Sequence, residues 1–307
     1  MKKILLPALL FSVLFASSQP TLQEKLGYSK DSKLLIIHAD DLGVSHSENE
    51  ASIAAMEKGS VNSASIMVPC PWFPEIAEYV RTHPKADLGL HLTLTSEWKY
   101  YKWGPVMANE KVPGLVNNIG YLYESVDSVI RSAMTSEVEK ELRAQIERAK
   151  KTGINFTHFD SHMGTLFSKA EYLETLIKLG REYKVPVLLS KPAFLYAYNL
   201  NLDSFTNNKD VLLDMIYMAN PEDYKKGMGN YYTGVLQSLQ PGVSEIIIHT
   251  AFDDGEMQAV TIDHADWGAA WRQADYNFFT GENCKKLLQE NNIHLITWRE
   301  IRDKLLR

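Results

Sequence analysis

The sequence has little cysteine, no excess of basic residues and no long apolar stretch beyond its first residues, and each shortage excludes a class of protein. Its two cysteines, Cys70 and Cys284, exclude a disulfide framework and cannot by themselves build a zinc finger or an iron–sulfur site. They could pair once, but separation in sequence says nothing about distance. With 32 Lys and Arg against 38 Asp and Glu, the chain offers no basic surface for nucleic acid. The rest of the composition, 45% hydrophobic and 23% charged over 307 residues, is that of a globular protein with a sizeable core.

The first residues have the three parts of a secretory signal peptide. Lys2 and Lys3 give a positive start, residues 4–15 form an uncharged apolar run, and residues 16–18 offer the small side chains that a signal peptidase needs. The run is shorter than the roughly 20 residues of a membrane span, and no other stretch approaches that length. We therefore expect a signal peptide over residues 1–18, a mature chain without a transmembrane span, and export to the periplasm or the cell exterior. An uncleaved N-terminal anchor is the alternative.

Short apolar runs then alternate with segments of helical spacing. We expect strands at 34–37, 61–68, 88–94, 155–159, 185–189, 245–248 and 294–297, and helices at 47–58, 74–81, 136–153, 169–183, 267–290 and 299–306. Ser136 and Glu139 have the spacing of a capping box for the third helix. Such alternation predicts a single α/β domain over residues 19–307, with a barrel-like parallel (β/α) fold of about seven units.

Two regions depart from this alternation. Residues 96–135 are rich in Trp, Tyr, Gly and Asn and show no clear period. A loop of this length within a compact domain is usually functional or disordered. The secondary structure of residues 196–239 is the least clear of the chain.

Polar residues lie at or just past four of the expected strands. They are Asp40-Asp41, His91, Asp160-Ser161-His162 and His249. Because the carboxyl ends of parallel strands gather on one face of such a fold, we expect these side chains to lie together. Singly, each has an ordinary explanation, since an acidic pair can cap a helix or line a turn and a lone buried histidine is commonly a core residue.

Taken together, these residues have the composition of a catalytic metal site. On an extended segment Asp40 and Asp41 would point to opposite faces, so one could bind a metal ion while the other stays free as a base. One Asp and two His would leave coordination positions open for water and substrate. The remaining Asp and His would supply a base and an acid for hydrolysis. Zinc suits these ligand types best, and magnesium, manganese or cobalt are alternatives.

Four motifs, in this order, resemble the YdjC-type carbohydrate deacetylases: LIIHADDLG at 35–43, GSVNSASIM at 59–67, LGLHLTLT at 88–95 and THFDSH at 157–162. The resemblance implies a barrel-like β/α fold and metal-dependent removal of acetyl groups from N-acetylated sugars. By motif position it implies Asp41, His91 and His162 as ligands of one divalent metal ion, Asp40 as general base and His249 as general acid. The chain departs from the family at Met163-Gly164-Thr165 and at Ser190-Lys191-Pro192, which leaves the particular sugar open.

Four further residues are candidates for binding substrate or supporting the site. Asp160 could orient a neighbouring ligand. Trp98 and Trp103 could stack on sugar rings or close their loop onto the core. Arg272 could contribute to the site or form a helical ion pair with Asp275, three residues along.

The sequence thus predicts a metal-dependent hydrolase that removes acetyl groups from an N-acetylated sugar or oligosaccharide. One alternative is a metal-dependent esterase that acts on O-acetyl groups of glycans, and another is an exported, non-catalytic sugar-binding protein. Phosphoester hydrolysis is disfavoured because no cluster of Arg or Lys accompanies the motifs. The expected partner is a small carbohydrate or glycan, and a homo-oligomer is possible.

Overall fold

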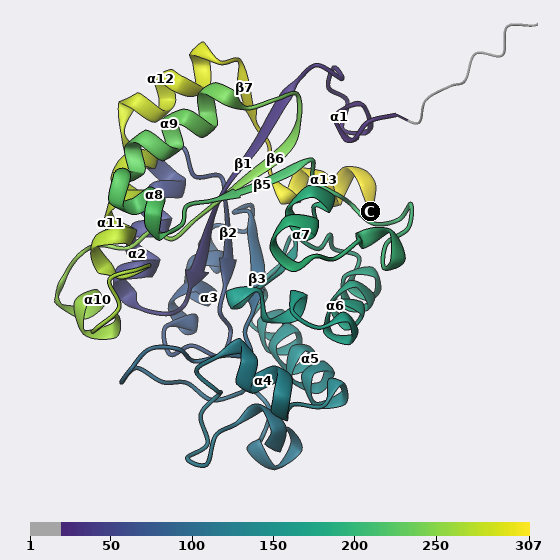
Figure 1. The fold of residues 1–307 in the computed structure, drawn as a ribbon, viewed down its shortest axis with the longest axis vertical. Helices are drawn as coiled ribbons and strands as arrows, with labels where there is room; N and C mark the ends of the chain where they lie inside the picture. Colours follow the sequence, from purple (N-terminus) through teal and green to yellow (C-terminus); the bar gives the residue numbers. More distant parts are fainter. Residues whose placement is uncertain (1–19) are drawn as a thin grey trace, which may run out of the picture.

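A parallel β-sheet forms the centre of the molecule (Figure 1), in a computed structural model that describes residues 20–307. The expected signal peptide lies outside these residues. Within them the sheet has seven strands: β1 (Lys33–Leu42), β2 (Ser63–Ile66), β3 (Leu88–Leu92), β4 (Phe159–Ser161), β5 (Met215–Met218), β6 (Gly242–Ile248) and β7 (Ile293–Leu295). Their pairings are parallel, as the alternation of apolar runs and helical segments predicts.

The strands curve into a barrel-like sheet. The hydrogen-bonded order is β4-β3-β2-β1-β6-β5, and β7 pairs with the start of β1. Two isolated parallel bridges lie beside the outer strands: Phe159 of β4 pairs with Val187, and Ser190 pairs with Leu213, two residues before β5. The strand expected at 185–189 is therefore reduced to single bridges, because Pro186 has no N–H to donate to a ladder. The chain is a single α/β domain, but not seven regular units.

Helices cover the sheet on both sides (Figure 1). One side carries α2 (His46–Lys58), α9 (Met228–Ser238), α11 (Ala269–Thr280) and α12 (Glu282–Glu290), and the other carries α5 (Thr135–Lys151), α6 (Ala170–Tyr183) and α7 (Lys191–Tyr198). The shorter or peripheral helices are α1 (Leu22–Lys25), α3 (Phe73–Thr82), α4 (Val126–Ser132), α8 (Pro221–Lys226), α10 (Gly255–Val260) and α13 (Trp298–Leu305). Four 3₁₀ turns complete the elements: η1 (Asn109–Lys111), η2 (Pro113–Leu115), η3 (His162–Phe167) and η4 (Leu202–Ser204). Of the helices in residues 20–307, none has the length and apolar character needed to span a membrane.

Strand β1 occupies the middle of the sheet. Residues 34–37 are fully buried because both faces of the strand are covered: Leu35 and Ile37 belong to the larger core cluster, and Leu34 and Ile36 belong to a second one. This explains a continuous apolar run rather than an alternating one. β6 pairs with β1 from Lys33 to Ala39, and β2 pairs with its later part. The C-terminal end of β1 is therefore held in the interior, where the first polar motif lies.

Several expected elements differ in extent from the observed ones. The strand expected at 61–68 is the shorter β2, and the one expected at 155–159 begins only at Phe159. The helix expected at 267–290 is two helices that meet at Gly281, whose backbone is extended. β5 lies where no strand is expected, although its four residues, Met-Ile-Tyr-Met, are all apolar. They are not fully buried, because β5 lies at the end of the strand order.

The expected capping box of α5 is wrong by two residues. The helix begins at Thr135, and the Glu137 carboxylate accepts a hydrogen bond of 2.8 Å from the Met134 N–H. Glu139 instead accepts hydrogen bonds from Arg143, one turn further along. The Glu139 carboxylate, which the sequence pattern assigns to the cap, therefore pairs with Arg143 within the helix instead.

The segment 96–135 folds onto the domain. It contains η1, η2 and α4, and a bridge between Thr95 and Tyr123 ties its beginning to the stretch just before α4. Trp98 and Trp103 are each only 3% exposed. These aromatic side chains therefore close the segment onto the protein interior.

Cys70 and Cys284 are both free thiols and both buried. Burial raises the pKa of the Cys284 thiol to about 11, and it raises that of Cys70 well above its usual value. Both side chains are therefore protonated at neutral pH and pack as small apolar groups. The disulfide that the sequence leaves open is not formed.

Candidate active site

The polar residues that follow the strands meet at one rim of the sheet. Asp40 and Asp41 lie near the end of β1, His91 lies near the end of β3, His162 directly follows β4, and His249 directly follows β6. Because these strands are parallel, their carboxyl ends face the same way. The structure thus brings together the five side chains that the sequence singles out.

The end of β1 is irregular, and the carboxylates of Asp40 and Asp41 both face the imidazole of His91. The register with β2 shifts between Ala39 and Leu42, and Asp41 has a φ of 72°, which is uncommon for a residue with a side chain. Asp40 Oδ1 lies 3.8 Å from His91 Nδ1, and Asp41 Oδ1 lies 3.4 Å from His91 Nε2. The expectation that the carboxylates point to opposite faces is wrong, because the bulge breaks the alternation of the strand.

Asp41, His91 and His162 form a compact cluster. Asp41 Oδ1 lies 3.3 Å from His162 Nδ1, and one ligand atom from each of the three residues lies within 4.8 Å of the others. Asp41 Oδ1 is buried and has no hydrogen-bond partner among the described residues, which is costly for a carboxylate oxygen unless a cation or polar ligand completes it. Two imidazole nitrogens and a carboxylate oxygen are donors that zinc and similar divalent ions accept. These residues fit a metal ion.

A carboxylate behind each histidine sets the direction of its ring. Asp160 Oδ1 lies 2.7 Å from His91 Nδ1, and Glu97 Oε2 lies 2.9 Å from His162 Nε2. Such contacts leave His91 Nε2 and His162 Nδ1 facing the cluster. Burial lowers the pKa of His162, but Glu97 and Asp41 outweigh burial and raise it to about 10. A divalent cation would therefore compete with protons for the histidine nitrogens.

A buried guanidinium holds the other oxygen of Asp41. Arg272 Nη2 donates to Asp41 Oδ2 at 2.8 Å, and Nη1 donates to Glu48 Oε2 at 2.7 Å. Burial alone would raise the pKa of Asp41, but Arg272 and His162 hold it well below its usual range. The alternative of a helical ion pair between Arg272 and Asp275 is wrong, because the Arg272 guanidinium points to Asp41 and Glu48 instead.

Asp40 and His249 flank the cluster. Asp40 Oδ2 lies 4.0 Å from His249 Nε2, and Ser65 Oγ donates to Asp40 Oδ1 at 3.2 Å. Asp275 positions His249 through its main chain, since its Oδ2 accepts from the His249 N–H at 3.0 Å. Burial lowers the pKa of His249 to about 4, so the imidazole is neutral at pH 7.

Sequence reasoning missed three residues of the site: His38, Glu48 and Glu97. His38 lies two residues before Asp40 on the same strand, so the period of a strand could have placed both on one side. Glu97 lies in the segment without a period, and Glu48 is one of several acidic residues on α2. No sequence signal distinguishes the two glutamates from surface residues.

Trp98 and Trp103 lie beside the cluster of Asp41, His91 and His162. Trp103 Nε1 donates to the Thr95 carbonyl at 2.9 Å, and its ring centroid lies 6.4 Å from that of His162. The Arg272 guanidinium lies 5.5 Å from the centre of the Trp98 ring. Both rings support the residues of the site, and their stacking on a sugar stays a prediction.

Together the fold and the site define a class: a parallel, barrel-like α/β domain with a potential metal site of one Asp and two His at the carboxyl rim. Comparison with known families gives a match to the family described as YdjC-like protein over residues 34–290. The matched range includes every residue of the cluster. The chain belongs to this family, which confirms the resemblance drawn from its motifs.

Relatives of known sequence and structure match over nearly their full lengths. A carbohydrate deacetylase of Thermus thermophilus is 32% identical over 292 residues, which cover 92% of this chain and 99% of the relative. A carbohydrate deacetylase of Brevibacillus brevis is 36% identical over 267 residues, which cover 87% and 99% of the two chains. The crystal structure of a proposed cellobiose-phosphate cleavage protein of Enterococcus faecalis superposes with a TM-score of 0.72 at 26% identity, covering 88% of this chain and 99% of that one.

Proposed function

We propose that this protein hydrolyses the acetamide of an N-acetylated sugar or oligosaccharide with the help of one divalent metal ion. The observation that carries the proposal is the meeting of Asp41, His91 and His162 within coordination reach, with Asp40 and His249 beside them. The two relatives described as carbohydrate deacetylases support a sugar as the substrate class.

Asp41 Oδ1, His91 Nε2 and His162 Nδ1 would hold the metal ion. A divalent ion bound by them would polarise the acetyl carbonyl and lower the pKa of a water molecule. Asp160 and Glu97 keep the two imidazoles turned toward the cluster, so the ligand atoms are already in place before substrate arrives. The ligand types favour zinc over magnesium, manganese or cobalt.

Asp40 is the proposed general base. Its Oδ1 is held by Ser65, while its Oδ2 faces His249. A carboxylate oriented in this way can accept the proton of the attacking water. Because His249 is neutral at pH 7, it must receive a proton during the reaction before it can donate one to the leaving amine. The 4.0 Å between Asp40 Oδ2 and His249 Nε2 is short enough for one bridging water or the substrate to carry that proton.

An O-acetyl esterase on glycans is the second candidate, because an ester needs the same activation of water. The position of His249 favours the amide, since an amine leaves only after it is protonated, whereas an alcohol depends less on an acid. A purely sugar-binding protein is disfavoured, because binding needs neither the buried Asp40 nor the His249 next to it.

The test is a screen for acetate release from N-acetylated and O-acetylated mono- and oligosaccharides, including chitobiose-like ones. We expect acetate and free amine in equal amounts, loss of both after chelation, and recovery when zinc, magnesium, manganese or cobalt is returned. Turnover that survives complete chelation would overturn the metal dependence. Acetate from O-acetylated glycans alone would favour the esterase, and binding without acetate from any substrate would favour the non-catalytic protein.

Export to the periplasm or the cell exterior is part of the same proposal. It is supported by Lys2, Lys3, the apolar run at 4–15 and the small residues at 16–18. The full chain with a C-terminal tag should be recovered outside the cytoplasm with an N-terminus near Gln19, as read by mass spectrometry. Recovery of the intact chain in the cytoplasm would contradict export.

A further inference from the structure

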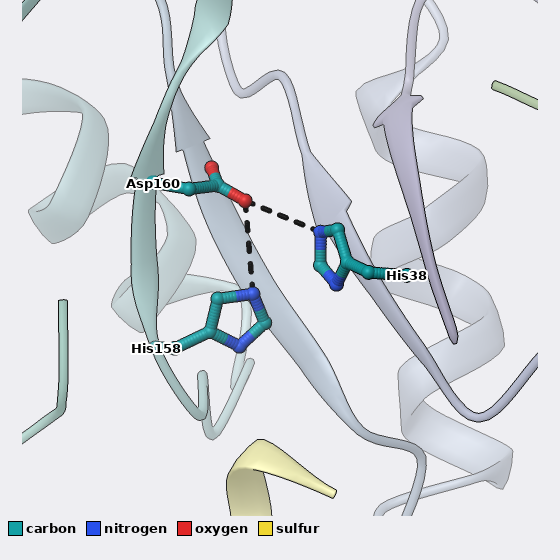
Figure 2. A group of neighbouring side chains, drawn as sticks. All are labelled: His38, His158 and Asp160. Carbon is teal, nitrogen blue, oxygen red and sulfur yellow. Dashed lines mark ion pairs between the residues drawn. The ribbon is translucent and has the colours of Figure 1, made fainter. Parts of the chain in front are cut away.

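A buried polar cluster lies behind the proposed active site, and its two histidines take no part in the mechanism above. Its members are His38 on β1, Ser63 and Ser65 on β2, and His158 and Asp160 at β4. Figure 2 shows the Asp160 carboxylate between the imidazoles of His38 and His158, with 3.2 Å and 3.7 Å to their Nε2 atoms. Both imidazoles are fully buried, so neither can touch a substrate.

His38 is the centre of this cluster. Its Nδ1 lies 2.9 Å from Ser63 Oγ, and its Nε2 lies 3.0 Å from Ser65 Oγ. The same Nε2 lies 3.0 Å from Asp40 Oδ1 and 3.2 Å from Asp160 Oδ2. A nitrogen that faces two carboxylate oxygens must carry a hydrogen, since a lone pair there would be repelled.

Charge supports the same assignment. Burial lowers the pKa of His38, but Glu245, Asp160 and Asp40 outweigh it and raise the pKa well above its usual value. His38 is therefore a cation held at neutral pH chiefly by the carboxylates of Asp40 and Asp160, because the pKa of Glu245 is itself raised to about 8. One imidazolium thus contacts both Asp40, the proposed base, and Asp160, which orients His91.

We propose that His38 is a positioning residue, whose imidazolium forms ion pairs with Asp40 and Asp160 at once and thereby fixes the general base relative to the metal ligand His91. The inference rests on the proposed function. Asp160 completes the link, because its Oδ1 lies 2.7 Å from His91 Nδ1 while its Oδ2 faces His38. His38, three residues before the bulge at Asp41, therefore supports Asp40 directly and His91 through Asp160.

His158 provides a matched control. It is buried as fully as His38 and also lies near Asp160, but its ring stacks on Trp298 at 5.1 Å and it forms no ion pair with Asp40 within residues 20–307. Its Nε2 has no hydrogen-bond partner within the described part of the chain. Replacement of His158 therefore perturbs the same buried region without releasing the base.

The experiment compares His38→Asn, His38→Gln and His158→Gln in the full mature enzyme. The amide nitrogen of Gln can stand near the position of Nε2, whereas that of Asn stands near Nδ1, so only Gln keeps the donor to Asp40 and Asp160. We expect His38→Asn to lower kcat about 10–100-fold, with KM and metal content close to wild type, and His38→Gln to recover most of kcat. His158→Gln should keep kcat within about threefold of wild type, whatever it does to the melting temperature.

A wild-type kcat in His38→Asn would overturn the proposal. Equal losses of kcat in the Asn and Gln variants, with a matching fall in melting temperature, would also overturn it, because they would indicate that His38 acts through packing alone. Two metal ions per wild-type chain, with one lost in His38→Asn, would also overturn it by making His38, His158 and Asp160 a second metal site. If the wild-type protein releases no acetate, the proposed function fails separately. Crystal structures of wild type and His38→Asn then decide: an Asp40 carboxylate that turns away supports the positioning role, and one that stays in place refutes it.

Discussion

Arg272 and Asp41, 231 residues apart in the sequence, form a buried hydrogen-bonded ion pair with 2.8 Å between Nη2 and Oδ2. The side chains are 2% and 3% exposed. Because the guanidinium takes one carboxylate oxygen, the other is left to face His91 and His162. The direction of the proposed metal ligand thus depends on a helix at the far end of the chain.

Replacement of Arg272 by Met should destabilise the fold. It would leave the carboxylates of Asp41 and Glu48 buried without their cation, which typically costs about 3–5 kcal/mol. Urea unfolding measures the loss. The control is Arg81→Met, which removes an exposed ion pair with Glu78 and should leave the stability close to that of wild type, because solvent screens such a pair. An Arg272→Met protein as stable as wild type would show that the two carboxylates are neutral or otherwise compensated.

Removal of a proposed ligand should remove the metal. His91→Ala takes away one of three donors, so we expect loss of bound metal together with most of the activity. Equilibrium dialysis against zinc or cobalt, followed by elemental analysis, gives the metal content per chain. His83→Ala is the matched control, because His83 lies on the surface beside Glu57. Wild-type metal affinity in His91→Ala would remove His91 from the ligand set.

Asp40→Asn should separate the base from the metal site. The amide cannot accept the proton of the attacking water, so kcat should fall by about 10²–10⁴-fold. Metal content should stay at the wild-type value, because Asp40 is not among the proposed ligands. Steady-state acetate release and elemental analysis on the same preparation test both statements. Undiminished turnover in Asp40→Asn would exclude Asp40 as the base.

Glu245 should make stability depend on pH. Burial raises its pKa from 4.5 to about 8 in the folded chain. The folded chain therefore binds this proton more tightly than the unfolded chain, and the free energy of unfolding contributed by Glu245 falls as pH rises from about 4.5 to about 8.

Glu245→Gln tests this dependence, because Gln cannot ionise but can still accept the hydrogen bond from Trp298 Nε1. We expect urea unfolding to give near-wild-type stability at about pH 6 and greater stability than wild type at about pH 9. Lower stability of the variant at the higher pH would mean that an ionised Glu245 stabilises the fold through His38.

The positions of the site residues could be predicted because they follow a local rule. Asp40, Asp41, His91, His162 and His249 each end or follow an apolar run, and parallel strands bring such positions to one rim. His38 follows an equally simple rule, because the two-residue period of a strand places it on the same side as Asp40. It is missed because a lone histidine among apolar residues resembles a core residue. Glu97 follows no pattern, because its segment shows neither the period of a strand nor that of a helix.

The sequence by itself determined the parallel α/β architecture, the rim at which the polar residues gather and the family, since all of these follow from apolar periodicity and short motifs. Only the tertiary structure decided that both carboxylates of Asp40-Asp41 face His91, that Arg272 supports Asp41 rather than Asp275, and that β5 exists. These features depend on a backbone bulge and on contacts between distant segments. No local pattern records such contacts, because their free energy arises only when the segments pack together.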